Sequence, residues 1–195
     1  MDNAQAPRTK PKLGVREKGQ LMSAAEIDRT LARLAHEILE RNNGVDGLVL
    51  VGVRRRGVPL AERLAGKIAA TERIAPSVET LDITFYRDDL STVDQKPVVQ
   101  RSGSFSVEGK TAILVDDVLY TGRTTRAALD ALVDHGRPRR VELCVLIDRG
   151  HREVPIEANY VGRTVQTADA EVIEVRLREV DEEERVMLCE KAAAM

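Results

Sequence analysis

One stretch of the sequence, TAILVDDVLYTGRTT at residues 111–125, constrains the fold more than any other. An apolar, strand-like run leads to two acids, Asp116 and Asp117, and a short loop around Gly122 then opens into a helical pattern. Carboxylates at the end of a parallel strand lie at the carboxyl edge of the sheet, where open α/β folds bind ligands. Free amides at the start of the following helix favour a phosphate. A ligand that suits both halves is a sugar phosphate, whose hydroxyl groups or bound Mg²⁺ face the acids.

The rest of the chain alternates strands with helices. The apolar patterns predict strands over 47–53, 78–84, 111–115, 141–147, 160–165 and 172–177. They predict helices that begin at Ser23, near Pro59 and at Thr124, the first of them through the capping-box pair Ser23 and Glu26. This alternation predicts an α/β fold with a parallel sheet. We expect a flexible leader over residues 1–18 and a single domain over 19–195, because 195 residues suit one compact core.

Composition excludes several classes of function. The chain has 30 Lys and Arg against 32 Asp and Glu, so nucleic acid could bind only through a local basic patch. No apolar run is long enough to span a membrane and the start of the chain lacks a signal peptide, which predicts a cytoplasmic protein without membrane contact. Cys144, Cys189 and the three histidines show neither disulfide nor metal-ligand spacing.

Asp116 and Asp117 could alternatively be the acidic element of a nucleoside triphosphatase. The matching phosphate loop is absent, because Ser104 stands where the first glycine of GxxxxGKT belongs and the GKT at 109–111 precedes a strand. A plain structural turn, in which the acids only cap the helix, remains the other alternative. The long polar stretch between Tyr86 and Gly109 is of a length typical of binding loops and lids.

The stretch VDDVLYTGRT at 115–124 resembles the phosphoribosyl-diphosphate signature of the type I phosphoribosyltransferases. Further segments resemble, in the same order, the branch that joins uracil phosphoribosyltransferase activity to attenuation of pyrimidine operons. These segments are VGVRRRG at 51–57, DITFYRDDL at 82–90, ALVDHGRP at 131–138 and LIDRGHREVPIEANYVGR at 146–163. The resemblance implies the type I phosphoribosyltransferase fold, a central, mainly parallel sheet flanked by helices with a small hood.

The resemblance also implies a reaction, in which N1 of uracil displaces pyrophosphate from phosphoribosyl diphosphate to give UMP. It implies Mg²⁺ bound through the pyrophosphate, without direct protein ligands. The implied catalytic residues are Asp116, Asp117 and Arg87. The implied phosphate-binding residues are Val118, Leu119, Tyr120, Thr121, Gly122, Arg123, Thr124 and Thr125. The pyrophosphate loop would be Arg54, Arg55, Arg56 and Gly57, and the base-binding residues Asp148, Arg149, Val161 and Gly162.

A second implied activity is binding of the pyrimidine-operon mRNA leader, controlled by uridine nucleotides. The residues that resemble an RNA-binding face are His36, His151, Arg152 and Arg163. We expect a homodimer or higher homo-oligomer to make this face continuous, and we expect its mutation to leave turnover intact. Ala32 and Glu157 lack the hydroxyl and the positive charge that would suit RNA. Two alternatives therefore stay open, a transferase without RNA binding or for another base, and a nucleotide-sensing RNA regulator with little catalysis.

Overall fold

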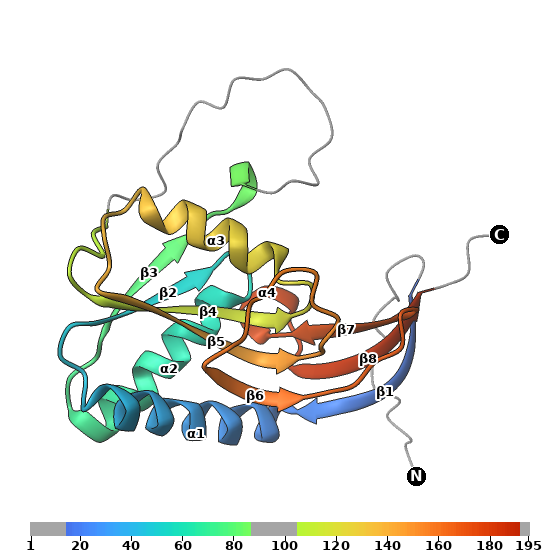
Figure 1. Ribbon diagram of the computed structural model, residues 1–195. Coiled ribbons are helices and arrows are strands. Elements are labelled where there is room, and N and C mark those ends of the chain that lie inside the picture. The colour runs from blue at the N-terminus through green and yellow to red at the C-terminus, as the bar shows by residue number, and fades with distance from the viewer. Residues whose placement is uncertain (1–14, 87–104, 192–195) are drawn as a thin grey trace, which may run out of the picture.

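The computed structural model describes residues 15–86 and 105–191. Its larger part is a five-stranded sheet in the order β3-β2-β4-β5-β6 (Figure 1). The strands are β2 (Leu48–Val53), β3 (Ser77–Leu81), β4 (Thr111–Leu119), β5 (Arg140–Asp148) and β6 (Tyr160–Thr164). All four pairings are parallel, which confirms the predicted fold class.

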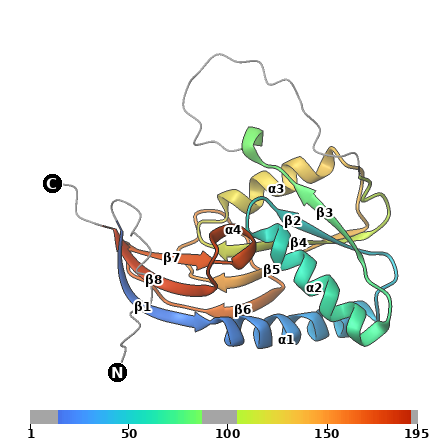
Figure 2. The ribbon, with the colours of Figure 1, turned by 180° about the vertical axis from the view of Figure 1, so that it is seen from behind.

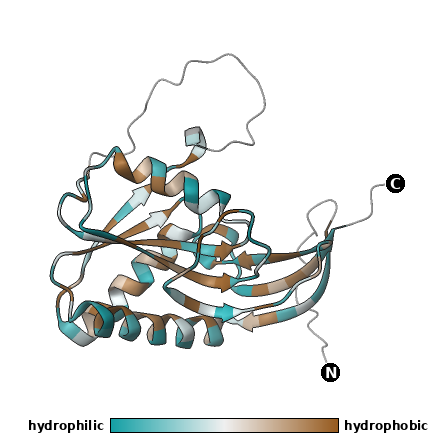
Figure 3. Ribbon diagram, viewed as in Figure 1, coloured by the Kyte–Doolittle hydropathy of each residue, from teal (hydrophilic) through white to brown (hydrophobic). Residues whose placement is uncertain are grey.

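Helices cover both faces of this sheet. In Figures 1 and 2, α1 (Ala24–Asn42) and α2 (Gly57–Glu72) lie on one face, and α3 (Arg123–Val133) lies on the other. The strands between them read as apolar runs because both faces are buried, and Figure 3 shows the same strands as mostly hydrophobic. The predicted capping box is confirmed, since Ser23 Oγ accepts the Glu26 amide at 3.4 Å and a Glu26 oxygen accepts the Ser23 amide at 2.8 Å.

A second, smaller sheet lies beyond the carboxyl ends of β4, β5 and β6 (Figure 1). It is antiparallel, in the order β1-β8-β7, with β1 (Val15–Ser23), β7 (Glu171–Arg176) and β8 (Arg185–Lys191). A short helix, α4 (Arg178–Asp181), joins β7 to β8. We call these three strands and α4 the hood. The predicted strand at 172–177 thus belongs to the hood and not to the parallel sheet.

The structure moves the predicted start of the ordered domain. Residues 15–18, which we assigned to a flexible leader, form the first part of β1 and pair with β8. No apolar alternation marks this strand in the sequence, because its residues 16–20 are all exposed. Strand β8 was not predicted either. Residues 1–14 lie outside the described part of the chain.

Other boundaries shift by a few residues. β4 continues to Leu119, so Asp116 and Asp117 lie within the strand, near its carboxyl end, and do not follow it. β3 ends at Leu81, and the Thr84–Tyr86 segment forms a short 3₁₀ helix, where the Asp82 carboxylate accepts both the amide and the hydroxyl of Thr84. Cys144 and Cys189 are buried free thiols. In the described ranges, none of the helices combines the length and apolar character needed to cross a membrane.

Candidate active site

The acid pair lies at the carboxyl end of β4, at the centre of the parallel sheet. Asp116 is 9% exposed and Asp117 is partly exposed. An Asp116 oxygen accepts the Asp117 amide and an Asp117 oxygen accepts the Val118 amide, both at 2.9 Å. Burial raises the pKa of Asp117, and the positive charge of Arg56 opposes that shift. Two carboxylates held so close need donors or positive charge from a ligand.

The predicted phosphate loop follows directly. Gly122 precedes α3 with a φ of 86°, and a Cβ there would lie 2.6 Å from Cγ2 of Val154. The carbonyl of Thr121 accepts the amides of Glu153 and Val154 at 2.9 and 3.3 Å, which fixes the loop to the segment after β5. The first backbone bond of α3 runs from the Arg126 amide to the Gly122 carbonyl at 2.9 Å, and the Arg123 amide donates to Thr121 Oγ1 at 3.4 Å, so the first-turn amides face the loop. This helix end can therefore hold an anion.

Within the predicted phosphate-binding stretch, three residues differ from expectation in what their side chains do. Leu119 and Thr125 are buried, so they reach a ligand only through their backbone. The side chain of Tyr120 does not lie on the phosphate loop. Its ring lies 4.0 Å below the guanidinium of Arg149 and meets the ring of His151 edge-on at 5.9 Å. Tyr120 thus belongs with the predicted base-binding residues.

The predicted pyrophosphate loop joins β2 to α2 and lies against the acid pair. A Cβ on Gly57 would lie 2.2 Å from the carbonyl oxygen of Val115, so only glycine lets the loop approach β4 this closely. The Arg54 amide donates to Leu81 at 3.0 Å, and its side chain donates to Asp82 at 2.9 Å. Arg55 is exposed.

Arg56, the third arginine, reaches the hood. Its Nε and Nη2 donate to the two carboxylate oxygens of Asp181 in α4, at 2.9 and 2.7 Å. The sequence analysis missed Asp181, because it stands in an acidic run, DEEE at 181–184, that looks like any solvated charged segment.

At the end of β5, Asp148 and Arg149 occupy the same carboxyl edge. Asp148 accepts the Gly150 amide at 2.9 Å and Arg152 Nη2 at 2.6 Å. Arg149 is 5% exposed and donates to Thr167 Oγ1 at 3.1 Å and to the Glu171 carbonyl at 2.9 Å. It is therefore a buried link from the sheet to the hood. Together with Asp148 it lines a cavity of about 460 Å³.

The other two predicted base-binding residues lie lower in the sheet. Val161 pairs with Val145, whereas Asp148, the last residue of β5, pairs with Thr164. The carbonyls of Val161 and Gly162 accept Arg33 of α1, at 3.1 and 2.7 Å, and a Cβ on Gly162 would lie 2.3 Å from the Leu146 carbonyl. These contacts face α1, and the assignment of Val161 and Gly162 to the base stays a prediction.

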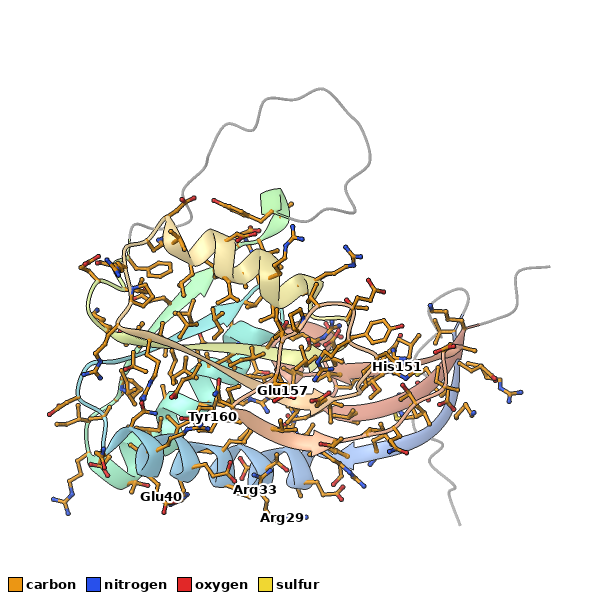
Figure 4. All side chains as sticks on the ribbon, in the orientation of Figure 1. Arg29, Arg33, Glu40, His151, Glu157 and Tyr160 are labelled. Carbon is orange, nitrogen blue, oxygen red and sulfur yellow. The ribbon has the colours of Figure 1, made fainter. Side chains whose placement is uncertain are left out.

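The predicted RNA-binding residues come from two parts of the fold. His36 on α1 contacts the Ala32 carbonyl at 2.7 Å, and Arg163 on β6 donates to the Leu21 carbonyl. His151 and Arg152 lie in the segment after β5, and Figure 4 shows His151 toward the hood, away from Arg29 and Arg33 along α1.

Arg152 is tied to the active site. Its guanidinium donates to the carbonyls of Tyr120, Gly150 and Ile156 at 2.9 to 3.1 Å and to Asp148. Arg152 therefore contacts residues predicted to bind phosphate and base, and the expectation that it lies apart from the sugar-phosphate site stays a prediction. Arg87, the third predicted catalytic residue, lies outside the described residues.

The described ranges contain no cluster of three or more His, Cys, Asp or Glu side chains that could hold a metal ion by itself. The acid pair and the predicted pyrophosphate loop instead suit a cation that arrives with a diphosphate. The carboxylates would favour the cation, and the arginines would favour the diphosphate.

A family model for the phosphoribosyl transferase domain matches residues 19–180. The chain therefore belongs to the phosphoribosyltransferase family, which confirms the resemblance seen in its motifs. Among curated proteins, it is 59% identical over 178 residues to the bifunctional protein PyrR of Pelotomaculum thermopropionicum, covering 91% of this chain and 98% of that protein. It is 55% identical over 181 residues to the bifunctional protein PyrR of Thermus aquaticus, with 92% and 100% covered. These relatives put the chain in the PyrR branch of the family.

Solved structures agree on the fold. The hypoxanthine phosphoribosyltransferase of Trypanosoma cruzi is 19% identical and superposes with a TM-score of 0.67, covering 90% of this chain and 98% of that one.

Proposed function

We propose that this chain transfers a phosphoribosyl group from phosphoribosyl diphosphate to uracil, giving UMP and pyrophosphate, and that it also regulates pyrimidine genes by binding their mRNA leader. One observation carries the first activity. The acid pair lies between a helix N-terminus on one side and the Arg54–Arg56 loop on the other, which matches a sugar with a phosphate at one end and a diphosphate at the other.

Each group then has a part in the transfer. The amides of residues 121–125 and the hydroxyls of Thr121 and Thr124 hold the 5′-phosphate, and Asp116 and Asp117 hold the ribose hydroxyls. The transition state at C1 has oxocarbenium character, so the nearby carboxylates favour it electrostatically. Arg54, Arg55 and Arg56 face the leaving pyrophosphate, and the predicted contribution of Arg87 stays a prediction.

Mg²⁺, when bound with phosphoribosyl diphosphate, neutralises part of the diphosphate charge. On the protein side, the carboxylates of Asp116 and Asp117 would favour the ion through their charge, while the diphosphate oxygens would coordinate it. Because both are held by backbone amides, their oxygens stay oriented toward the ligand.

The base lies, in this proposal, beside Asp148, Arg149 and Tyr120. The Arg149 guanidinium holds the Tyr120 ring face-on, and its bonds to Thr167 and Glu171 tie that pair to the hood. A flat, rigid surface of this kind suits an aromatic base.

The test is UMP formation from uracil, phosphoribosyl diphosphate and Mg²⁺, with hypoxanthine, guanine and orotate as parallel substrates. We expect turnover with uracil alone. Absence of turnover with any base would overturn the enzymatic proposal, and turnover with another base would reassign the substrate.

The regulatory activity has its own supporting observation. Arg29, Arg33 and Arg163 line a cavity of about 320 Å³ between α1 and β6, a local basic surface on a chain of net charge −2. Arg152, a further predicted RNA-binding residue, donates to the Tyr120 carbonyl next to the phosphate loop, so a bound nucleotide can affect its position. We retain the proposals of a homo-oligomer and of a cytoplasmic site of action, where the leader transcript is present.

Binding of a pyrimidine-operon leader hairpin, measured with and without UMP over a series of salt concentrations, tests this activity. We expect UMP-dependent binding that weakens steeply with salt. Arg163→Glu should abolish it, and salt-insensitive or UMP-independent binding would contradict the proposal.

A further inference from the structure

We propose that Asp181 of the hood is a positioning residue for the pyrophosphate loop, because it holds Arg56 away from Asp117 and ready for the diphosphate. The inference rests on the proposed function, since it assumes that the Arg54–Arg56 loop meets pyrophosphate.

The contact between Arg56 and Asp181 is a two-point ion pair. Arg56 Nε and Nη2 donate to Asp181 Oδ2 and Oδ1 at 2.9 and 2.7 Å, the parallel geometry that fixes both position and orientation of a guanidinium. The two side chains are 23% and 16% exposed, so water screens the pair only in part. The pair raises the pKa of Arg56, whose charge is thus fixed at all working pH values.

Arg56 stands between two acids of different function. Asp117, one of the ribose acids, also acts on Arg56 electrostatically, and Arg56 in turn lowers the pKa of Asp117. If Asp181 lost its charge, the half-buried guanidinium would have Asp117 as a remaining anionic neighbour. An Arg56–Asp117 pair would occupy the carboxylate that the ribose needs and would turn Arg56 from the diphosphate.

Asp181 is itself held in place. It accepts the Leu177 amide at 3.1 Å, which anchors it at the turn from β7 into α4. The loop is anchored separately, through the Leu81 carbonyl and the close approach of Gly57 to Val115. The backbone positions of Asp181 and of the loop therefore do not depend on their ion pair. The ion pair determines only the orientation of the Arg56 side chain.

The same short helix offers a matched control. Glu179 forms a comparable two-point pair with Arg63 of α2, at 2.8 Å for both contacts, and this pair involves no residue of the site. Glu179→Gln thus removes a hood-to-α2 ion pair of the same kind without touching the pyrophosphate loop.

The experiment compares Asp181→Asn with Glu179→Gln in steady-state kinetics and in calorimetric binding of phosphoribosyl diphosphate with Mg²⁺. We expect Asp181→Asn to raise KM for phosphoribosyl diphosphate and to weaken its binding about tenfold, with KM for uracil within twofold of wild type. Glu179→Gln should leave both KM values unchanged, with a smaller shift in Tm because Arg63 keeps its ion pair with Glu184 at 2.6 Å. Asp181→Glu, which keeps the charge, should recover part of the affinity.

Two results would overturn the inference, unchanged phosphoribosyl diphosphate affinity in Asp181→Asn, or an equal loss in Glu179→Gln. If Asp181→Asn does not fold, Asp181→Glu gives the decision, because its longer side chain should still raise that KM about threefold while KM for uracil stays unchanged. An unaltered Asp181→Glu would also overturn the inference. A wild-type chain that binds no phosphoribosyl diphosphate would instead overturn the proposed function on which the inference rests.

Discussion

The parallel sheet and the hood hold their parts of the site in different ways. The sheet places Asp116, Asp117 and the phosphate loop by burial, since the strands around them are apolar on both faces (Figure 3). The hood also buries apolar residues in the core, among them Ile173, Val175 and Val186, and it carries a network of ion pairs, such as those of Arg176 with Glu17, Glu174 and Glu183. The comparison indicates that the sheet fixes the reacting groups rigidly, while the hood adds contacts that charge and solution conditions can alter.

The largest effect should follow from a change at the sheet edge. We expect Asp117→Asn to lower turnover by about 10²-fold or more, because a group aimed at the developing charge is lost. The same variant should be more stable than wild type at neutral pH, because burial raises the pKa of Asp117 and the folded protein bears the cost of its charge. Steady-state kinetics and thermal unfolding check both effects, and equal turnover would contradict the catalytic assignment.

The second-largest effect should come from Gly122→Ala, which changes the phosphate loop. The added Cβ would meet Val154 at 2.6 Å in a backbone with a φ of 86°, so we expect a loss of about 2–3 kcal/mol in unfolding free energy together with weaker phosphoribosyl diphosphate binding. Gly109→Ala is the control, since its φ of 68° brings similar strain with nothing within 4 Å. The control should lose only about 1 kcal/mol and no affinity. Equal losses of unfolding free energy in the two variants would contradict the claim that contact with Val154 makes Gly122→Ala more damaging.

Arg152→Ala tests the link between the segment after β5 and the phosphate loop. Loss of its bonds to Tyr120 and Asp148 should raise KM for phosphoribosyl diphosphate about tenfold, the effect of losing a charged hydrogen bond. Arg139→Ala, which loses a bond to Thr111 at the opposite end of β4, serves as the control. Normal kinetics in Arg152→Ala would restore the original expectation that this residue concerns RNA alone.

The smallest expected effect is a loss of stability in the hood at low pH. Ion pairing with Arg63 lowers the pKa of Glu179, and pairing with Lys18 lowers that of Glu171, so both groups stabilise the fold above their ordinary pKa of 4.5. This stability is lost as the pH falls through their lowered folded values. We expect the amide-exchange protection factors of β1, β7 and β8 to fall below pH 4.5 before those of β2, β4 and β5 change. Simultaneous change in both sheets would contradict the contrast.

The same contrast explains what the sequence could predict. Residues 111–125 code a strand, a turn and a helix within one local segment, so the acid pair and the phosphate loop were found without long-range information. β1 escaped prediction because it is exposed and is defined by its pairing with β8, more than 160 residues away in sequence, as the Val15–Lys191 pair shows. The Arg56–Asp181 contact spans a separation of 125 residues, and the stacking of Tyr120 on Arg149 also depends on tertiary placement.

Val161 and Gly162 show what a motif leaves open. Their segment resembles the family pattern, yet the register of β6 places them below the sheet edge and turns their carbonyls to Arg33. A strand's register is set by its partners in the sheet, which a motif alone does not give.

The most direct test of this account is one assay that measures kcat and both KM values for Asp117→Asn and Asp181→Asn beside wild type, with uracil as substrate. The account predicts a fall in kcat for the sheet variant and a rise in KM for phosphoribosyl diphosphate alone for the hood variant. A kcat defect in the hood variant with an unchanged kcat in the sheet variant would contradict the division of the site between the two regions.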